Sequence, residues 1–326
     1  MLAWGDSTEV LGMTRFIEDE SVEVVIGALV GVIDVEDGPT TEQRAVLQAL
    51  VSGYWGRSDL DVGAMKPVSV DDTAASVTDP RARRRLRELM VLLELCRHPL
   101  SEAQVARIEE YAAGLGESGP GLQIARDLVR KNAGVARADY ARFLEGQAEE
   151  LAEPSLRRKY PLGDFTAPDH ELAARLRALS DLPEGTLGYE YVEFYRRNGL
   201  TLPGDDPHIP LTFVSHDMCH VISGYEPVGV DEIALGGMQL AMTDTDVHWL
   251  QFLGNLGVHE AGYLGGASLV PREGTLARPG ATETLAHALT RGSECTGDFT
   301  AADHLGMADR PLVDVREEFG VPPRLR

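Results

Sequence analysis

Two segments in the first half of the chain share one pattern, and this pattern is typical of helical hairpins. Residues 32–56 (VIDVEDGPTTEQRAVLQALVSGYWG) and 92–116 (LLELCRHPLSEAQVARIEEYAAGLG) align on Pro39 and Pro99. Each reads as an apolar helix, a polar turn containing the proline, and an amphipathic helix. Because hairpins of this kind bury their apolar faces by stacking, we expect a helical bundle over the first 147 residues.

The second helix of each hairpin begins with the spacing of a capping box. Thr40 is followed three residues later by Gln43, and Ser101 by Gln104. In a capping box, the Ser or Thr side chain accepts a hydrogen bond from the third residue, whose own side chain reaches back to the cap. The sequence therefore predicts that helices begin directly after Thr40 and Ser101.

The rest of the chain also favours helices, so the predicted fold class is all-α with two helical domains. Strand signals are few and short, and no Walker loop, GxGxxG or GxSxG motif is present. Residues 148–168 are charged and contain three prolines, which predicts a linker or a surface crossing. Residues 169–326 carry most of the histidines and form the predicted second domain.

Charge and cysteine content exclude several classes of protein. The net charge is −22, and such an acidic chain is repelled by nucleic acid and by anionic membranes. The three cysteines form no CxxC pair, so neither a disulfide framework nor a zinc ribbon is expected. The longest apolar stretch, residues 24–33, is too short for a membrane span of ~20 residues. We expect a cytoplasmic protein with no transmembrane segment and no nucleic-acid partner.

An acidic–glycine turn before a capped helix characterises residues 25–50 (VIGALVGVIDVEDGPTTEQRAVLQAL). With its surroundings, roughly residues 20–145, this segment resembles the TerB-like family, which is named for tellurite-resistance proteins. The acidic loop at residues 34–37 either holds a divalent cation or is a solvated turn. We expect the arginine-rich segment at residues 81–87 to be a solvated face that pairs with the excess acid of the chain, and a site that docks a partner is the alternative.

The second half contains the residues that point to chemistry: His216, Asp217, His220 and Glu232. On a helix, His216 and His220 lie one turn apart, and Asp217 falls within ~100° of both. Glycines and a proline at residues 224–229 then turn the chain back, so that Glu232 opens a second helix. Because apolar residues flank these groups, we expect a divalent metal to satisfy them. A polar helix surface is the alternative.

This HDxxH motif, separated by eleven residues from the following Glu, resembles that of the coenzyme Q (ubiquinone) biosynthesis protein 4 family. Residues 182–200 (LPEGTLGYEYVEFYRRNGL), 230–243 (VDEIALGGMQLAMT) and 309–323 (DRPLVDVREEFGVPP) also resemble segments of that family. The similarity covers roughly residues 160–326. It implies a helical domain with an apolar groove for a prenylated quinone precursor.

The resemblance implies that His216, Asp217, His220 and Glu232 hold one divalent ion, either Zn, Fe, Mn or Co. His216 and Asp217 are the expected catalytic residues, with Asp217 acting either as a ligand or as a general base. The implied activity is that of a decarboxylase-like lyase or oxidoreductase. A non-catalytic scaffold that binds a quinone precursor is the alternative. Other biosynthetic enzymes and a second copy of the chain are the implied partners.

Two departures from the family pattern argue for a different substrate. LTFVSHD replaces the basic segment that usually precedes the motif, and TAADHLGMADRP lacks the usual Trp. We therefore expect a small hydrophobic aromatic or polyketide-like carboxylic acid from quinone or specialised-metabolite biosynthesis. Tyr191, Tyr195 and Tyr225 are candidate substrate-binding residues, and an ordinary core stripe is the alternative for the first two.

Other interpretations compete with this one. An HD-type phosphohydrolase would need an upstream histidine, His170 or His208, and a downstream acid, Asp244 or Asp246. His259 belongs to a second His–acid pair that either supports the metal site or is independent of it. A response to tellurite or metal stress through the first domain is a further reading.

Overall fold

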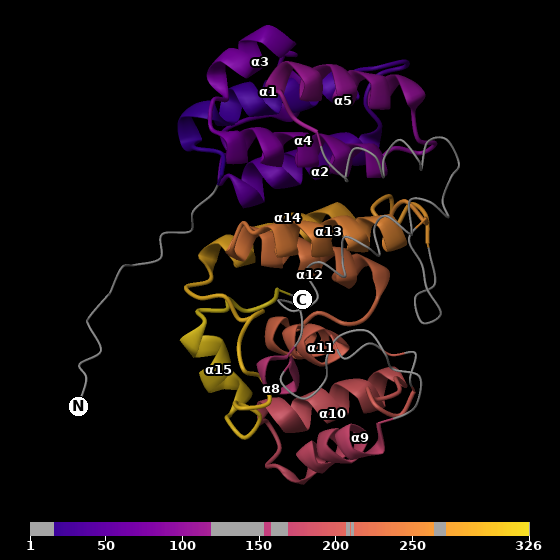
Figure 1. Ribbon diagram of the computed structural model, residues 1–326, viewed down its shortest axis with the longest axis vertical. Coiled ribbons are helices and arrows are strands. Elements are labelled where there is room, and N and C mark those ends of the chain that lie inside the picture. Colours follow the sequence, from indigo (N-terminus) through magenta and orange to yellow (C-terminus); the bar gives the residue numbers. More distant parts are fainter. Residues whose placement is uncertain are drawn as a thin grey trace, which may run out of the picture.

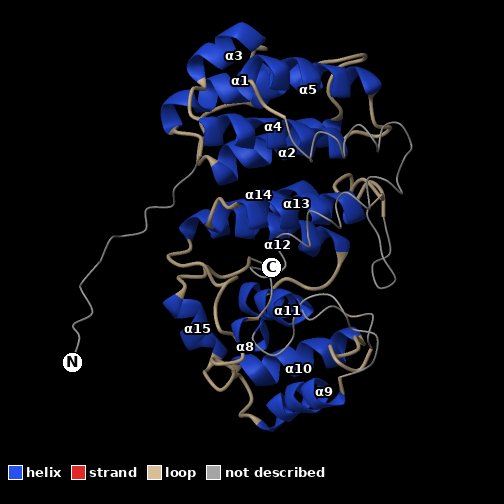
Figure 2. Cartoon of the chain, viewed as in Figure 1, coloured by secondary structure: helices blue, strands red, loops and turns tan. Residues whose placement is uncertain are grey.

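The computed structural model describes residues 16–118, 153–157, 169–206, 209, 212–263 and 272–325. Among these residues, regular structure is helical throughout, and β-pairing is limited to isolated bridges (Figure 2). The prediction of an all-α fold is confirmed. No helix in this described part is long and apolar enough to cross a membrane.

The helices form three layers along the long axis of the molecule (Figure 1). The first layer holds η1 (Asp19–Ser21), α1 (Val22–Ile33), α2 (Thr41–Ala49), η2 (Leu50–Tyr54), η3 (Val62–Ala64), α3 (Val70–Ser76), α4 (Pro80–Leu95) and α5 (Glu102–Leu115). The middle layer holds α12 (Gly229–Met242), α13 (Asp246–His259) and α14 (Ala281–Glu294). The third holds α8 (Pro154–Arg157), α9 (His170–Arg177), η4 (Ala178–Asp181), α10 (Leu187–Asn198), α11 (Thr212–Ser223) and α15 (Leu312–Glu318).

Both predicted helix starts are correct, but only one of them is a complete capping box. Thr40 accepts from the Gln43 amide at 3.1 Å, and the Gln43 side chain accepts from the Thr40 amide at 3.1 Å. Ser101 accepts from the Gln104 amide, but the Ser101 amide donates to Glu94 Oε1 at 2.8 Å. The Gln104 side chain instead accepts from Gln43 Nε2 at 2.8 Å. The equivalent glutamines of the two hairpins thus join them.

Glu94 gives the bundle a dependence of stability on pH. Burial raises the pKa of Glu94 from 4.5 to about 8. The folded chain therefore binds more protons than the unfolded chain between these values, and stability falls as pH rises through them. Replacing Glu94→Gln should remove this contribution. Denaturant unfolding at about pH 6 and pH 9 should show the native protein losing on the order of 1–3 kcal/mol relative to the variant. Parallel losses in both proteins would contradict this assignment.

The first and middle layers share one hydrophobic core, to which α1, α2, α4 and α5 contribute together with α12, α13 and α14. Two glycines allow the close packing of this region. A Cβ on Gly53 of η2 would lie 2.7 Å from the Ala286 carbonyl oxygen of α14. A Cβ on Gly292 of α14 would lie 2.1 Å from the Met238 carbonyl oxygen of α12. Any side chain at either glycine would force these backbones apart.

The expected domain boundary near residue 147 and most of the expected linker lie outside the described residues, so this division stays a proposal. The described part of the linker, residues 153–157, packs into the third layer rather than crossing the surface. Glu153 is fully buried, and its carboxylate lies 2.9 Å from His304 Nδ1 and accepts from the Leu305 amide at 3.0 Å.

The expectation of a solvated arginine face was wrong for two of the arginines on α4. Arg85 and Arg87 are buried. Arg85 Nε donates to Asp244 Oδ1 at 2.7 Å, and its guanidinium also pairs with Glu88. The other Asp244 oxygen accepts from the Tyr54 hydroxyl at 2.6 Å. Arg85 is buried because its face of α4 packs against the connection between α12 and α13, which supplies the acidic partner.

Candidate metal centre

Helices α11 and α12 bring the predicted site residues together. His216, Asp217 and His220 lie on α11, and Glu232 lies in the first turn of α12, which follows α11 in the chain (Figure 1). Gly224 directly follows the last residue of α11. Its φ is +79°, a left-handed conformation that favours glycine. The chain can therefore reverse within a few residues and return Glu232 to α11.

Three ligand atoms are spaced as a small divalent cation requires. His216 Nε2 and His220 Nε2 are 3.1 Å apart. Glu232 Oε2 lies 3.3 Å from the first and 3.4 Å from the second. For metal bonds of about 2.0–2.1 Å, the ligand atoms of a tetrahedral site stand about 3.3 Å apart. These two histidines and this carboxylate therefore fit a metal ion.

Asp217 lies beside this trio and is tied to a tyrosine. One oxygen of its carboxylate falls within 4.8 Å of ring nitrogens of His216 and His220, so the three residues form a group able to hold an ion. Asp217 Oδ2 accepts a hydrogen bond from the Tyr195 hydroxyl. Burial raises the pKa of Asp217, and the neighbouring histidines only partly oppose this effect. The expected roles of Asp217 as a ligand or as a general base stay predictions.

His220 is held in one orientation. Its Nδ1 lies 3.1 Å from the Tyr225 carbonyl oxygen, and its ring stacks on Phe194 with centroids 5.5 Å apart. An Nδ1–H that donates to a carbonyl leaves the Nε2 lone pair directed at the site, as in metal-binding histidines generally.

The electrostatics of the cluster favour a cation. Burial opposes charge on His220 and Glu232, but their mutual attraction outweighs it. The pKa of His220 is therefore raised, and the pKa of Glu232 is held well below its ordinary value. Glu232 is thus an anion that a bound proton or metal ion would neutralise.

The three candidate substrate-binding tyrosines occupy different places. Tyr195 contacts the site through Asp217. Tyr191 is fully buried against the Tyr195 ring, with centroids 4.9 Å apart, and its hydroxyl has no hydrogen-bond partner among the described residues. The guanidinium groups of Arg291 and Arg324 both lie over the Tyr225 ring, with their central carbons 5.1 and 4.7 Å from its centroid. The backbone carbonyl of Tyr225 therefore contacts His220, while the Tyr225 ring packs against the two arginines.

Two buried side-chain atoms near the candidate metal centre have no hydrogen-bond partner among the described residues. His259, at the end of α13, has a buried Nδ1 without a hydrogen-bond partner in the described part of the chain, and the same holds for Thr275 Oγ1. Burial lowers the pKa of His259. Sequence reasoning noted His259 without placing it and missed Thr275, because a lone threonine in a polar segment gives no signal.

The residues that a phosphohydrolase would need are elsewhere. Asp244 is bound to Arg85 and Tyr54, and Asp246 pairs with Arg84 at 3.2 Å. His170 is exposed at the start of α9, and His208 lies outside the described residues.

Glu260 is the acid that follows His259 and completes the second His–acid pair of the sequence. Its Oε1 lies 2.9 Å from His98 Nε2, so it joins the end of α13 to the first layer and not to the candidate metal centre.

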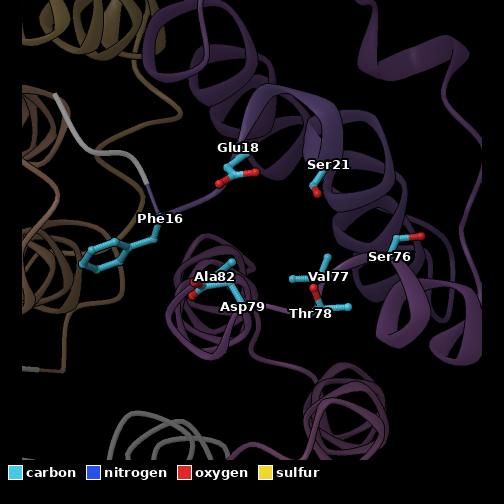
Figure 3. Close-up of a pocket in the computed structure, with 8 residues that line it drawn as sticks. All are labelled: Phe16, Glu18, Ser21, Ser76, Val77, Thr78, Asp79 and Ala82. Carbon is cyan, nitrogen blue, oxygen red and sulfur yellow. The ribbon is translucent and has the colours of Figure 1, made fainter. Parts of the chain in front are cut away.

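A separate hollow of about 290 Å³ lies in the first layer, near the start of α4 (Figure 3). Glu18 and Ser21 stand on one side of it, and residues 76–79 with Ala82 stand on the other. The Phe16 ring points away from the other labelled side chains. No residue of the metal centre lines this hollow.

No family model matches the chain, and no curated protein matches it either. The expected TerB-like relationship of the first half therefore stays a prediction. Among solved structures, a match is a "putative ubiquinone biosynthesis protein" from Nostoc punctiforme PCC 73102, with 17% sequence identity. The match covers 73% of this chain and 98% of that chain, with a TM-score of 0.35.

Proposed function

We propose that the protein is a divalent-metal-dependent enzyme that acts on a hydrophobic aromatic or polyketide-like carboxylic acid. The proposed reaction class is decarboxylation. The observation that carries the proposal is the convergence of His216 Nε2, His220 Nε2 and Glu232 Oε2 within 3.1–3.4 Å of one another. Catalytic metal sites commonly use three protein ligands and keep a further position for substrate or water.

In this proposal, His216, His220 and Glu232 hold the ion, with Asp217 either beside it or as a fourth ligand. A bound Zn, Fe, Mn or Co ion would supply Lewis-acid stabilisation of negative charge on substrate oxygens, and Fe or Mn would add redox capacity. The Tyr225 carbonyl orients His220, and the Phe194 ring covers one face of its imidazole.

The pair of Asp217 and Tyr195 is suited to deliver a proton. Loss of CO₂ breaks the bond between the carboxylate carbon and the substrate, and it leaves an electron pair that a proton must neutralise. Burial favours the protonated form of Asp217. The Tyr195 hydroxyl donates to Asp217 Oδ2, so Oδ1 is the oxygen that would carry the transferable proton.

The test is conversion of metal-loaded protein with 4-hydroxybenzoates that carry alkyl or prenyl chains, followed by mass spectrometry of the products. We expect the decarboxylated phenol from the native protein and a loss of about 10²-fold or more in Asp217→Asn. Glu193→Gln, at a half-buried position of α10 where Glu193 pairs with the exposed Arg196, is the control and should keep full activity.

Metal-loaded native protein that binds these acids without forming product would contradict the enzymatic proposal. The non-catalytic scaffold reading would then lead. Full activity in Asp217→Asn would contradict the role given to that residue.

A further inference from the structure

We propose that the first turn of α12, together with Thr275 and His259, forms a subsite for the carboxylate of the substrate beside the candidate metal centre. This inference rests on the proposed function, because it assigns the group that recognises the acid. It involves the residues left without partners around Gly229, the first residue of α12.

The start of α12 presents backbone N–H groups that the helix itself does not use. The helix has 14 residues, and its N-cap, Val228, makes no side-chain capping bond. The first amides of a helix have no partner within the helix, and the helix dipole makes this end favourable for anions. Backbone N–H groups at such an end bind carboxylates and phosphates in many proteins.

Two buried polar atoms converge on the same place. A Cβ built on Gly229 would lie 3.4 Å from Thr275 Oγ1 and 3.5 Å from His259 Nδ1. Thr275 is fully buried, and neither atom has a hydrogen-bond partner among the described residues. Buried polar groups are nearly always paired, so these two indicate a polar ligand. A hydroxyl and an imidazole N–H are the donors that a carboxylate accepts.

Gly229 also fixes where this ligand would sit. It lies three residues before Glu232 on the same helix, which is about 4.5 Å along the axis. An acid held there would be within reach of the metal centre. The neighbouring acid Asp231 is already neutralised by two hydrogen bonds of 2.8 Å from Arg324. Glu232 would still repel an anion, so we expect the subsite to bind only when a metal neutralises that carboxylate.

Two substitutions test the subsite without disturbing the fold. In Gly229→Ala, the added methyl would make ordinary van der Waals contacts with Thr275 and His259 and would occupy the place of the ligand. Thr275→Val removes the hydroxyl and keeps the shape. Thr284→Val, at a half-buried position on α14 where the hydroxyl donates to the Gly280 carbonyl, is the control for the same substitution away from the subsite.

The measurement is isothermal titration calorimetry of metal-loaded protein with benzoate and with the neutral analogue benzyl alcohol. We expect benzoate to bind about tenfold more weakly to Gly229→Ala and Thr275→Val than to the native protein. Benzyl alcohol binding, the metal content and the thermal midpoint should stay unchanged.

Unchanged benzoate affinity in both variants, or no benzoate binding to metal-loaded native protein, would overturn the subsite. These results differ from failure of the proposed function. If native protein binds benzoate through this subsite but converts no aromatic acid, the subsite stands and the enzymatic proposal fails. If the protein converts an aromatic acid but Gly229→Ala and Thr275→Val bind benzoate normally, the enzymatic proposal stands and the subsite fails.

Discussion

Replacing His220 by alanine should reduce the bound metal from about one equivalent per chain to nearly none. His220 is almost fully buried, and its Nε2 lies within hydrogen-bond or ion-pair distance of both His216 and Glu232. Its loss leaves two ligand atoms and a gap between them, and metal affinity falls steeply when one ligand of three is removed. Inductively coupled plasma mass spectrometry of protein purified without added metal measures this directly.

Two further variants make this result specific. Glu232→Gln keeps the shape of the side chain but removes the charge, and it should also lose metal. His170→Ala removes an exposed histidine at the start of α9 and should keep the native metal content. Equal metal content in native protein and His220→Ala would refute the centre. Native protein that holds no metal after reconstitution would do the same, and the cluster would then be structural.

Replacing Arg85→Met should destabilise the protein by about 3–5 kcal/mol. Arg85 is fully buried and pairs with Asp244 and Glu88. Glu88 also pairs with the buried Arg87 at 3.2 Å, so the removal of Arg85 leaves Asp244 as the buried carboxylate that loses its cation. The contact of Arg85 with Asp244 joins α4 to the connection between α12 and α13. Loss of this contact should therefore destabilise both the first and the middle layer. Urea unfolding followed by far-ultraviolet circular dichroism gives the free energy of unfolding.

The neighbouring arginine provides the control. Arg84 pairs with Asp246 at 3.2 Å, but both side chains are about 40% exposed, at 39% and 42%. An exposed pair contributes about 0–1 kcal/mol, so Arg84→Met should be nearly neutral. Similar destabilisation in both variants would mean that burial of Arg85 carries no special weight.

Local patterns were enough to predict that the residues of the candidate metal centre lie close together. The spacing of His216 and His220 places both on one helical face, and the glycine turn returns Glu232 to them within a few residues. All of these residues lie within two consecutive helices, so no distant contact has to be known. The same holds for the starts of α2 and α5, where a cap acts on amides two or three residues away.

The prediction that the arginines of α4 lie in solvent was wrong for Arg85, although a local pattern indicated its burial. Arg85 stands four residues before Leu89 and seven before Leu92, so the helical period already placed it on the buried stripe of α4. Reading the segment as a charge run hid this signal. The partner was beyond prediction, because Asp244 is 159 residues away in the chain.

By itself, the sequence determined the helical fold class, the starts of α2 and α5, and the candidate ligands carried by α11 and α12. These features depend on side chains within a few residues of one another, so the 3.6-residue period and the turn residues suffice. Only the tertiary structure decided which faces meet. It buried Arg85 with Asp244, placed Glu153 against His304, and brought Thr275 and His259 to the first turn of α12. Such contacts depend on how whole helices pack, and no local pattern encodes them.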